Sequence, residues 1–70
     1  MATADQTGTR LRQAREAAGL SKRQLALLAG VTRWQITTWE TGKYPPSPLS
    51  LAKLIPHIGG TVDHYLLDDK

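Results

Sequence analysis

Apolar residues recur along the chain at the three- and four-residue spacing of helices, and no stretch shows the strict alternation of a strand. Glycines and prolines stand between the periodic stretches, where helix ends and short connections are expected. The pattern predicts an all-α fold of five helices with loops of two to six residues, at residues 7–18, 21–28, 32–41, 48–58 and 61–67.

Capping residues mark where these helices begin. Serine or threonine precedes glutamine by three residues at two of the starts, which is the pattern of a capping box, and a third start has proline at its first helical position. The predicted N-caps are Thr7, Ser21, Thr32, Ser47 and Thr61. Pro56 lies inside the fourth pattern and predicts a kink or an early end. Residues 1–7 are expected to be a flexible segment, 8–67 one domain and 68–70 a tail.

The spacing of small and apolar residues in 22–41 predicts a helix-turn-helix. Ala26 is small enough for two helices to cross closely, and Gly30 supplies the positive φ of a tight turn. Val31, Ile36 and Trp39 then face the interior. The residues expected to face outward, where a groove-reading helix needs them, are Arg33, Trp34, Thr37 and Thr38.

Positive charge is concentrated in the first part of the chain. Residues 10–43 carry seven Lys or Arg against two Glu, a net charge of +5, whereas each flanking segment carries −1. A basic segment favours a polyanionic partner, although a solvated helix surface would also explain it.

Other classes of function are disfavoured by the sequence. The absence of cysteine excludes disulfides and thiolate metal sites, and no apolar run is long enough to span a membrane. His57 and His64 lack ligand-like neighbours, and no catalytic triad is recognisable, so we expect no metal, no cofactor and no enzyme activity. Residues 1–8 do not resemble a signal peptide, and the expected compartment is the cytoplasm.

A set of motifs follows in one register without gaps: residues 11–21, Leu25-Ala26, 29–32, Ile36, Trp39-Glu40, Gly42-Lys43, Pro46-Ser47, Leu51, Leu54, Ile58-Gly59 and 61–63. Through these motifs the sequence from residue 8 to residue 67 resembles the Cro/phage-repressor (Xre) type of helix-turn-helix domain. The resemblance implies a five-helix repressor domain that binds double-stranded operator DNA, usually as a homodimer on a two-fold symmetric site. It also implies an ion pair between Arg15 and Glu40, and a phosphate contact at Lys22.

The leading hypothesis is a transcription regulator, specifically a repressor, that places its third helix in the major groove. The alternative is an antitoxin-type module that also binds a protein toxin. Arg33 suits guanine but can also contact phosphate, the threonines can contact bases or be ordinary surface, and Trp34 can pack on thymine methyl groups and sugars or on neighbouring helices. The predicted contacts to the DNA backbone are Lys22, Arg23, Gln35, Lys43, Tyr44 and Arg10, with Arg12 as an alternative to Arg10. For Gln35 we favour the capping role.

The last predicted helix bears on assembly. Val62, Tyr65 and Leu66 follow helical spacing and should point inward. Leu67 falls outside that stripe and, with Leu49, can form part of a two-fold contact or be scattered surface.

Overall fold

A computed structural model describes residues 2–67. Within that range the chain forms five helices and no strand: α1 (Ala4–Ala17), α2 (Lys22–Ala29), α3 (Arg33–Glu40), α4 (Pro48–Ile58) and α5 (Val62–Leu66). The prediction of an all-α fold with five helices is confirmed. The tail predicted for 68–70 lies outside the described residues.

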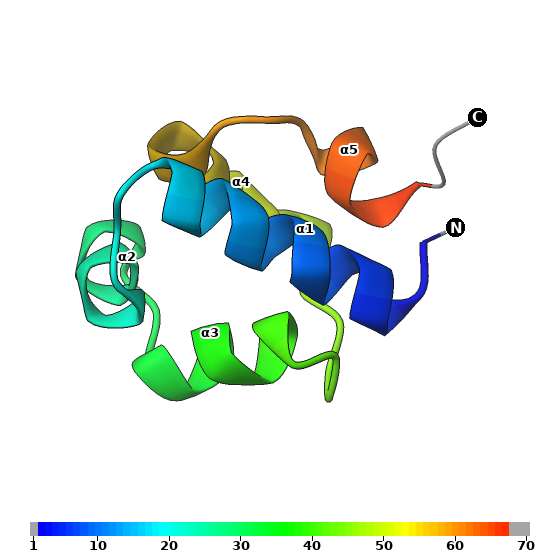
Figure 1. The fold of residues 1–70 in the computed structure, drawn as a ribbon, viewed down its shortest axis with the longest axis horizontal. Coiled ribbons are helices and arrows are strands. Elements are labelled where there is room, and N and C mark those ends of the chain that lie inside the picture. Colours follow the sequence, from blue (N-terminus) through cyan, green and yellow to red (C-terminus); the bar gives the residue numbers. More distant parts are fainter. Residues whose placement is uncertain (1, 68–70) are drawn as a thin grey trace.

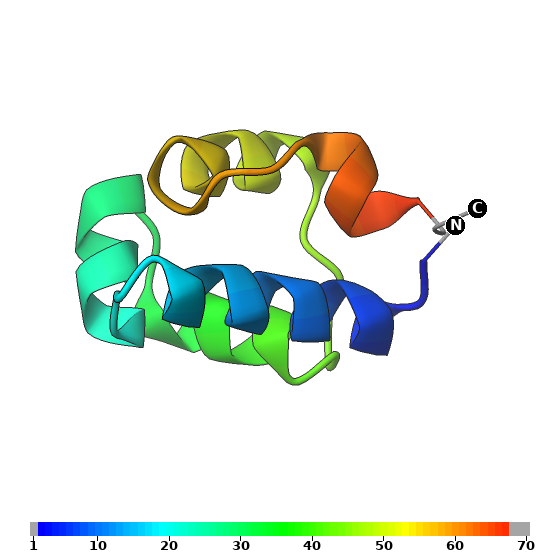
Figure 2. The ribbon, with the colours of Figure 1, turned by 45° about the horizontal axis from the view of Figure 1, so that its top comes forward.

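The helices pack around α1. Figure 1 shows α1 running through the middle of the molecule, and α3 packs along one side of it while α4 and α5 pack along the other. α2 closes one end through contacts with α3 and α4. In the second view α3 lies behind α1, while α4 and α5 lie together above it (Figure 2). The surface of α3 that faces away from α1 is therefore not covered by α4 or α5.

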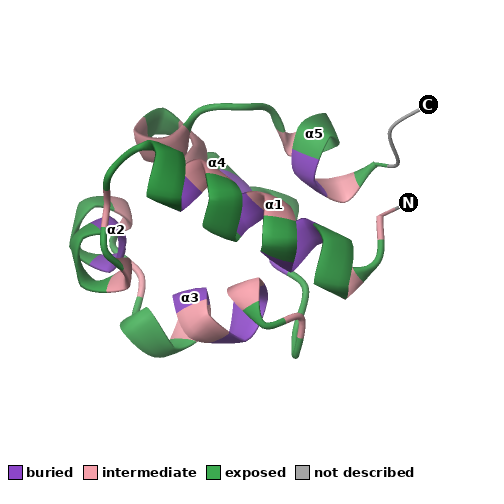
Figure 3. Cartoon of the chain, in the orientation of Figure 1, coloured by how far each residue is buried: buried purple, intermediate pink, exposed green. Residues whose placement is uncertain are grey.

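One apolar core joins all five helices. Figure 3 shows that the buried residues lie on the inner sides of the helices. The core residues are Leu11, Leu25, Ala26, Ile36, Trp39, Leu51, Leu54 and Tyr65, and Val31, Val62 and Leu66 pack against them. The inward positions predicted for the helix-turn-helix and for the last helix are confirmed.

The first helix begins earlier than predicted. Thr3 is its N-cap, because the Thr3 hydroxyl accepts from Gln6 N and the Gln6 side chain accepts from Thr3 N. Thr7, predicted as the cap, is instead buried in the first turns of α1 and donates to the Tyr65 carbonyl at 2.6 Å. Residues 4–7 thus belong to the helix, and this contact ties α1 to α5.

The range 48–58 predicted for the fourth helix is confirmed, since α4 continues to Ile58. Of the two alternatives predicted at Pro56, a kink or an early end, the early end is therefore wrong. Pro56 lies in the last turn, so it removes only one helical hydrogen bond, to the carbonyl of Ala52. The Gly59 amide donates to the Ile55 carbonyl at 2.7 Å and closes the helix.

α1 and α3 approach each other closely at Gly8. A β-carbon at this residue would lie 2.5 Å from the carbonyl oxygen of Trp39 and 2.6 Å from that of Glu40. Only glycine lets the two backbones come this close, and the last turn of α3 is positioned by the contact.

Candidate nucleic-acid interface

The turn between α2 and α3 has the geometry that its glycine predicts. Gly30 adopts φ +71° and ψ +31°, the left-handed conformation, and its amide donates to the Ala26 carbonyl. The Val31 amide donates to the same carbonyl at 3.1 Å. α3 then begins at once, because Thr32 and Gln35 form a capping box with bonds of 2.9 and 3.0 Å. The direction in which α3 leaves the turn is therefore fixed by local hydrogen bonds.

The first turn of α3 faces away from the core. Ile36 and Trp39 are buried and anchor the helix, whereas Arg33 is exposed and Trp34 is 63% exposed. Thr37 is half-buried. Figure 3 shows the exposed start of α3 followed by its partly buried middle. The outward placement predicted for Arg33 and Trp34 agrees with the structure.

The prediction that Thr38 faces outward is wrong. Thr38 is 5% exposed, and its hydroxyl donates to the Gln35 carbonyl at 2.8 Å. The loop after α3 folds back over this residue: the amides of Lys43 and Tyr44 donate to the Thr38 carbonyl at 3.1 and 3.4 Å. Thr38 therefore anchors the loop instead of facing a ligand.

This fold-back brings two aromatic side chains together on the surface. The rings of Trp34 and Tyr44 have centroids 6.4 Å apart and are tilted by 48°. Tyr44 is 52% exposed, and the Lys43 ammonium lies 5.9 Å from the centre of its ring. Trp34 thus has Tyr44 as a neighbour and still presents most of its surface to solvent.

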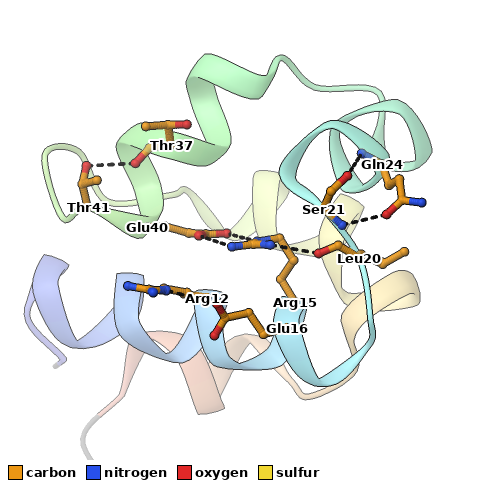
Figure 4. A network of polar contacts seen from close by, with 9 residues as sticks. All are labelled: Arg12, Arg15, Glu16, Leu20, Ser21, Gln24, Thr37, Glu40 and Thr41. Atoms are coloured by element: carbon orange, nitrogen blue, oxygen red, sulfur yellow. Dashed lines mark hydrogen bonds and ion pairs between the residues drawn. The ribbon is translucent and has the colours of Figure 1, made fainter.

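The predicted pair of Arg15 and Glu40 is present and links α1 to α3. Arg15 Nε and Nη2 donate to the two carboxylate oxygens of Glu40 at 2.7 and 3.1 Å, and Arg15 Nη1 donates to the Leu20 carbonyl at 2.9 Å (Figure 4). Both side chains are nearly buried, at 10% and 4% exposure. The hydrogen bond that Arg15 donates to Glu40 raises the pKa of the Arg15 guanidinium above its ordinary value, which keeps Arg15 positively charged.

Beside this pair is a polar pocket of about 290 Å³ lined by residues of three helices. Its lining comprises Arg12, Arg15, Glu16, Lys22, Glu40 and Thr41. Arg12 is also 3.4 Å from Glu16 on the same helix. Lys22 is the first residue of α2, where the free amides of a helix start favour an anion. Arg23, next along α2, and Lys43, in the loop after α3, are exposed.

Arg10 does not face the α3 side, where a contact to DNA was predicted. Its guanidinium donates to the carbonyls of His64 and Leu67 at 2.9 and 2.7 Å, at the C-terminal end of α5. α5 packs on the side of α1 opposite α3 (Figure 1). The structure thus makes Arg10 a bridge between helices. Gln35 accepts hydrogen bonds from Thr32 through its amide oxygen, which agrees with the favoured capping role.

Three features of the structure were missed from the sequence. The Thr3–Gln6 capping box has the same spacing as the two that were recognised, so the signal was present. Leu27 and Leu28 are 75% and 53% exposed on α2, and helical spacing from the buried Leu25 and Ala26 would have placed them outside. Gly8 had no local signal, because its close approach to α3 is a tertiary contact.

Two further observations concern the described residues only. No cluster of three or more His, Cys, Asp or Glu side chains is placed there to hold a metal ion. None of the helices within 2–67 has the length and apolar character that crossing a bilayer requires.

A helix-turn-helix whose second helix exposes its first turn is the architecture of a DNA-binding domain. A family model described as helix-turn-helix matches residues 11–63, and the chain belongs to this family of Cro/phage-repressor (Xre) type, whose members are DNA-binding transcription regulators. No curated protein has a significant sequence match to the chain.

Proposed function

We propose that this protein is a sequence-specific repressor that reads the major groove of double-stranded operator DNA with α3. The observation that carries the proposal is the orientation of α3. Arg33 and Trp34 project outward from its first turn, while Ile36 and Trp39 hold its opposite side in the core. The N-terminal residues of a recognition helix are the ones that reach base edges.

Arg33 is the main base-reading residue in this proposal. An exposed arginine at the start of the helix can donate two parallel hydrogen bonds to O6 and N7 of a guanine. Thr37 lies one turn further on the same side and can contact a base through its methyl or hydroxyl group. Gln35 uses its amide oxygen in the cap, which leaves its NH₂ group for a phosphate.

Positive side chains around α3 would contact the phosphates on either side of the groove. Lys22 and Arg23 at the start of α2, Lys43 in the loop after α3, and Arg12 beside the polar pocket are the candidates; Tyr44 can add a hydroxyl contact. Arg12 replaces Arg10, which is bonded to α5. Four such contacts in each of two subunits give an expected slope of log K against log salt of about −7.

Two copies are expected on DNA, since one domain of this size covers one half-site. Leu49 and Leu67 are 80% and 45% exposed and are our candidates for the contact between copies. Like other regulators of this type, the protein would act in the cytoplasm, where the DNA lies.

Selection of bound sequences from random duplex DNA tests the proposal. A palindromic product with half-sites about one helical turn apart is the expected result. Equal recovery of all sequences, or binding that does not change with salt, would contradict it.

A second candidate function is the antitoxin-type module, which binds a protein toxin as well as operator DNA. The observation that favours it is the pair of exposed leucines on α2, Leu27 and Leu28. Co-purification with the product of the neighbouring gene, lost in the Leu27→Asp variant, would support this function.

A further inference from the structure

The rings of Trp34 and Tyr44 form a surface that is here called the aromatic platform. The proposed function uses only the Tyr44 hydroxyl, for a phosphate, and leaves the faces of the two rings without a role. We propose that the aromatic platform reads the C5-methyl group of a pyrimidine in the major groove, next to the base pair that Arg33 contacts. The inference rests on the proposed function and adds the chemical group that this part of the site recognises.

The first step is position. Trp34 is the second residue of α3 and follows Arg33, so both side chains leave the turn of the helix that enters the groove. Trp34 is 63% exposed, which leaves most of its indole available for contact. An exposed tryptophan is a typical contact residue at interfaces.

The second step is the support of the indole. Thr38 lies one turn after Trp34, and its carbonyl accepts from the amides of Lys43 and Tyr44 at 3.1 and 3.4 Å. These bonds hold the Tyr44 ring beside Trp34, with centroids 6.4 Å apart. The Lys43 ammonium lies 5.9 Å from the centre of the Tyr44 ring. The two rings are therefore already held in place in the free protein, and less side-chain conformational entropy is lost when DNA binds.

The third step is the chemistry of the indole, which has one N–H donor and no acceptor. Adenine and cytosine each present an amino group in the major groove, and an indole packed on either leaves that group without an acceptor. Thymine presents a methyl group and the O4 acceptor instead. 5-Methylcytosine carries the same methyl group but keeps the amino group. The expected order of affinity at this position is thymine, then 5-methylcytosine, then cytosine.

The size of the effect follows from one buried methyl group. Removing that methyl is expected to weaken binding about fourfold per half-site, and about 15-fold for a two-fold symmetric site. The preferred operator is expected to place this pyrimidine beside a guanine, because Arg33 and Trp34 are consecutive.

The experiment uses the operator obtained by selection from random duplex DNA. Each thymine is replaced in turn by deoxyuridine, which removes only the methyl, and the critical thymine is then replaced by cytosine or 5-methylcytosine with guanine opposite. The wild-type protein should lose about fourfold per half-site at one thymine. The Trp34→Ala variant should bind the thymine and deoxyuridine duplexes equally. The wild-type protein should bind the 5-methylcytosine duplex more tightly than the cytosine duplex, because only the methyl group differs between them. The further gain in affinity from 5-methylcytosine to thymine reports the part of recognition that depends on the rest of the base.

Matched variants of Tyr44 test the support. Tyr44→Phe keeps the ring and should keep the methyl preference, whereas Tyr44→Ala should reduce it; circular dichroism checks that each variant is folded. The inference is overturned if deoxyuridine is neutral at every position, or if Trp34→Ala retains the full methyl effect. Both results leave operator binding intact. A selection that yields no preferred sequence would instead contradict the proposed function.

Discussion

Gly8→Ala is expected to stabilise α1 as an isolated helix but to destabilise the folded protein. Gly8 lies inside α1. Replacing a helical glycine by alanine would by itself stabilise the helix by about 0.8–1.0 kcal/mol. In the structure, however, the added β-carbon would lie 2.5 Å and 2.6 Å from the carbonyl oxygens of Trp39 and Glu40.

The cost of the substitution follows from these two distances. An ordinary contact of a β-carbon begins near 3.4 Å, so α1 and α3 would have to separate by about 0.9 Å. The obstructing atoms belong to the backbone and cannot rotate away. Overpacking of this kind costs about 1–3 kcal/mol in the free energy of unfolding. Here it would also pull Glu40 away from Arg15, whose Nε lies 2.7 Å from the Glu40 carboxylate in the wild-type structure. Weakening of this ion pair is expected to cancel the propensity gain of about 0.8–1.0 kcal/mol. We therefore expect a net loss of about 1–3 kcal/mol in the free energy of unfolding.

Thermal and urea unfolding followed by circular dichroism measure this loss. For a domain of this size, 1 kcal/mol corresponds to a change of about 4–8 °C in Tm. Thr9→Ala is the matched control, because Thr9 is the next residue of α1 but is exposed, and its stability should change by at most about 0.5 kcal/mol. A Gly8→Ala protein that melts at or above the wild-type temperature would refute the close approach of α1 and α3.

Substitutions at three other places test separate parts of the fold: the turn at Gly30, the Arg15–Glu40 pair and Tyr65. Gly30→Ala should cost about 1–2 kcal/mol through its positive φ alone, because no described atom other than those of Gly30 and its two chain neighbours lies within 4 Å of the β-carbon position. Gly30→Asn should cost less, and unfolding in urea measures both. Glu40→Ala leaves a nearly buried guanidinium unpaired and should cost about 3–5 kcal/mol, whereas the double variant Arg15→Met, Glu40→Leu should be more stable than Glu40→Ala in the same assay. Burial raises the pKa of the Tyr65 hydroxyl above its ordinary value of 10.0, so the unfolded chain loses this proton first and stability should fall as pH rises past 10.0. In Tyr65→Phe that alkaline loss should be smaller in melting curves recorded between about pH 8 and 11.

Local signals explain why most of the fold could be predicted from the sequence. Ser21, Thr32, Ser47 and Thr61 each cap a helix in the structure, and Gly30 adopts the left-handed conformation that its turn needs. These features depend on residues within four positions of one another. Thr3 obeys the same rule through Gln6, so the true start of α1 was readable and was passed over in favour of Thr7.

The parts of the site that could not be predicted depend on residues distant in sequence. Thr38 lies on the predicted outward side of its helix, but the loop at 42–44 folds back on it. Arg10 was grouped with the other cations by charge, although it donates hydrogen bonds to carbonyls at α5 that lie more than 50 positions away in the sequence. The contact of Trp34 with Tyr44 follows from the same fold-back of the loop. Periodicity shows which side of a helix is apolar, but not which neighbouring segment covers the polar side.

The most direct test of the central claim compares the variants Arg33→Ala and Lys22→Ala on the selected operator and on a scrambled duplex. If α3 reads the bases and α2 contacts the backbone, Arg33→Ala lowers the ratio of operator to scrambled affinity about 5- to 150-fold per half-site. Lys22→Ala weakens binding to both duplexes alike, leaves that ratio unchanged and makes the salt slope less steep by about 1 for each subunit. The same change of ratio in both variants would contradict the placement of α3 in the major groove.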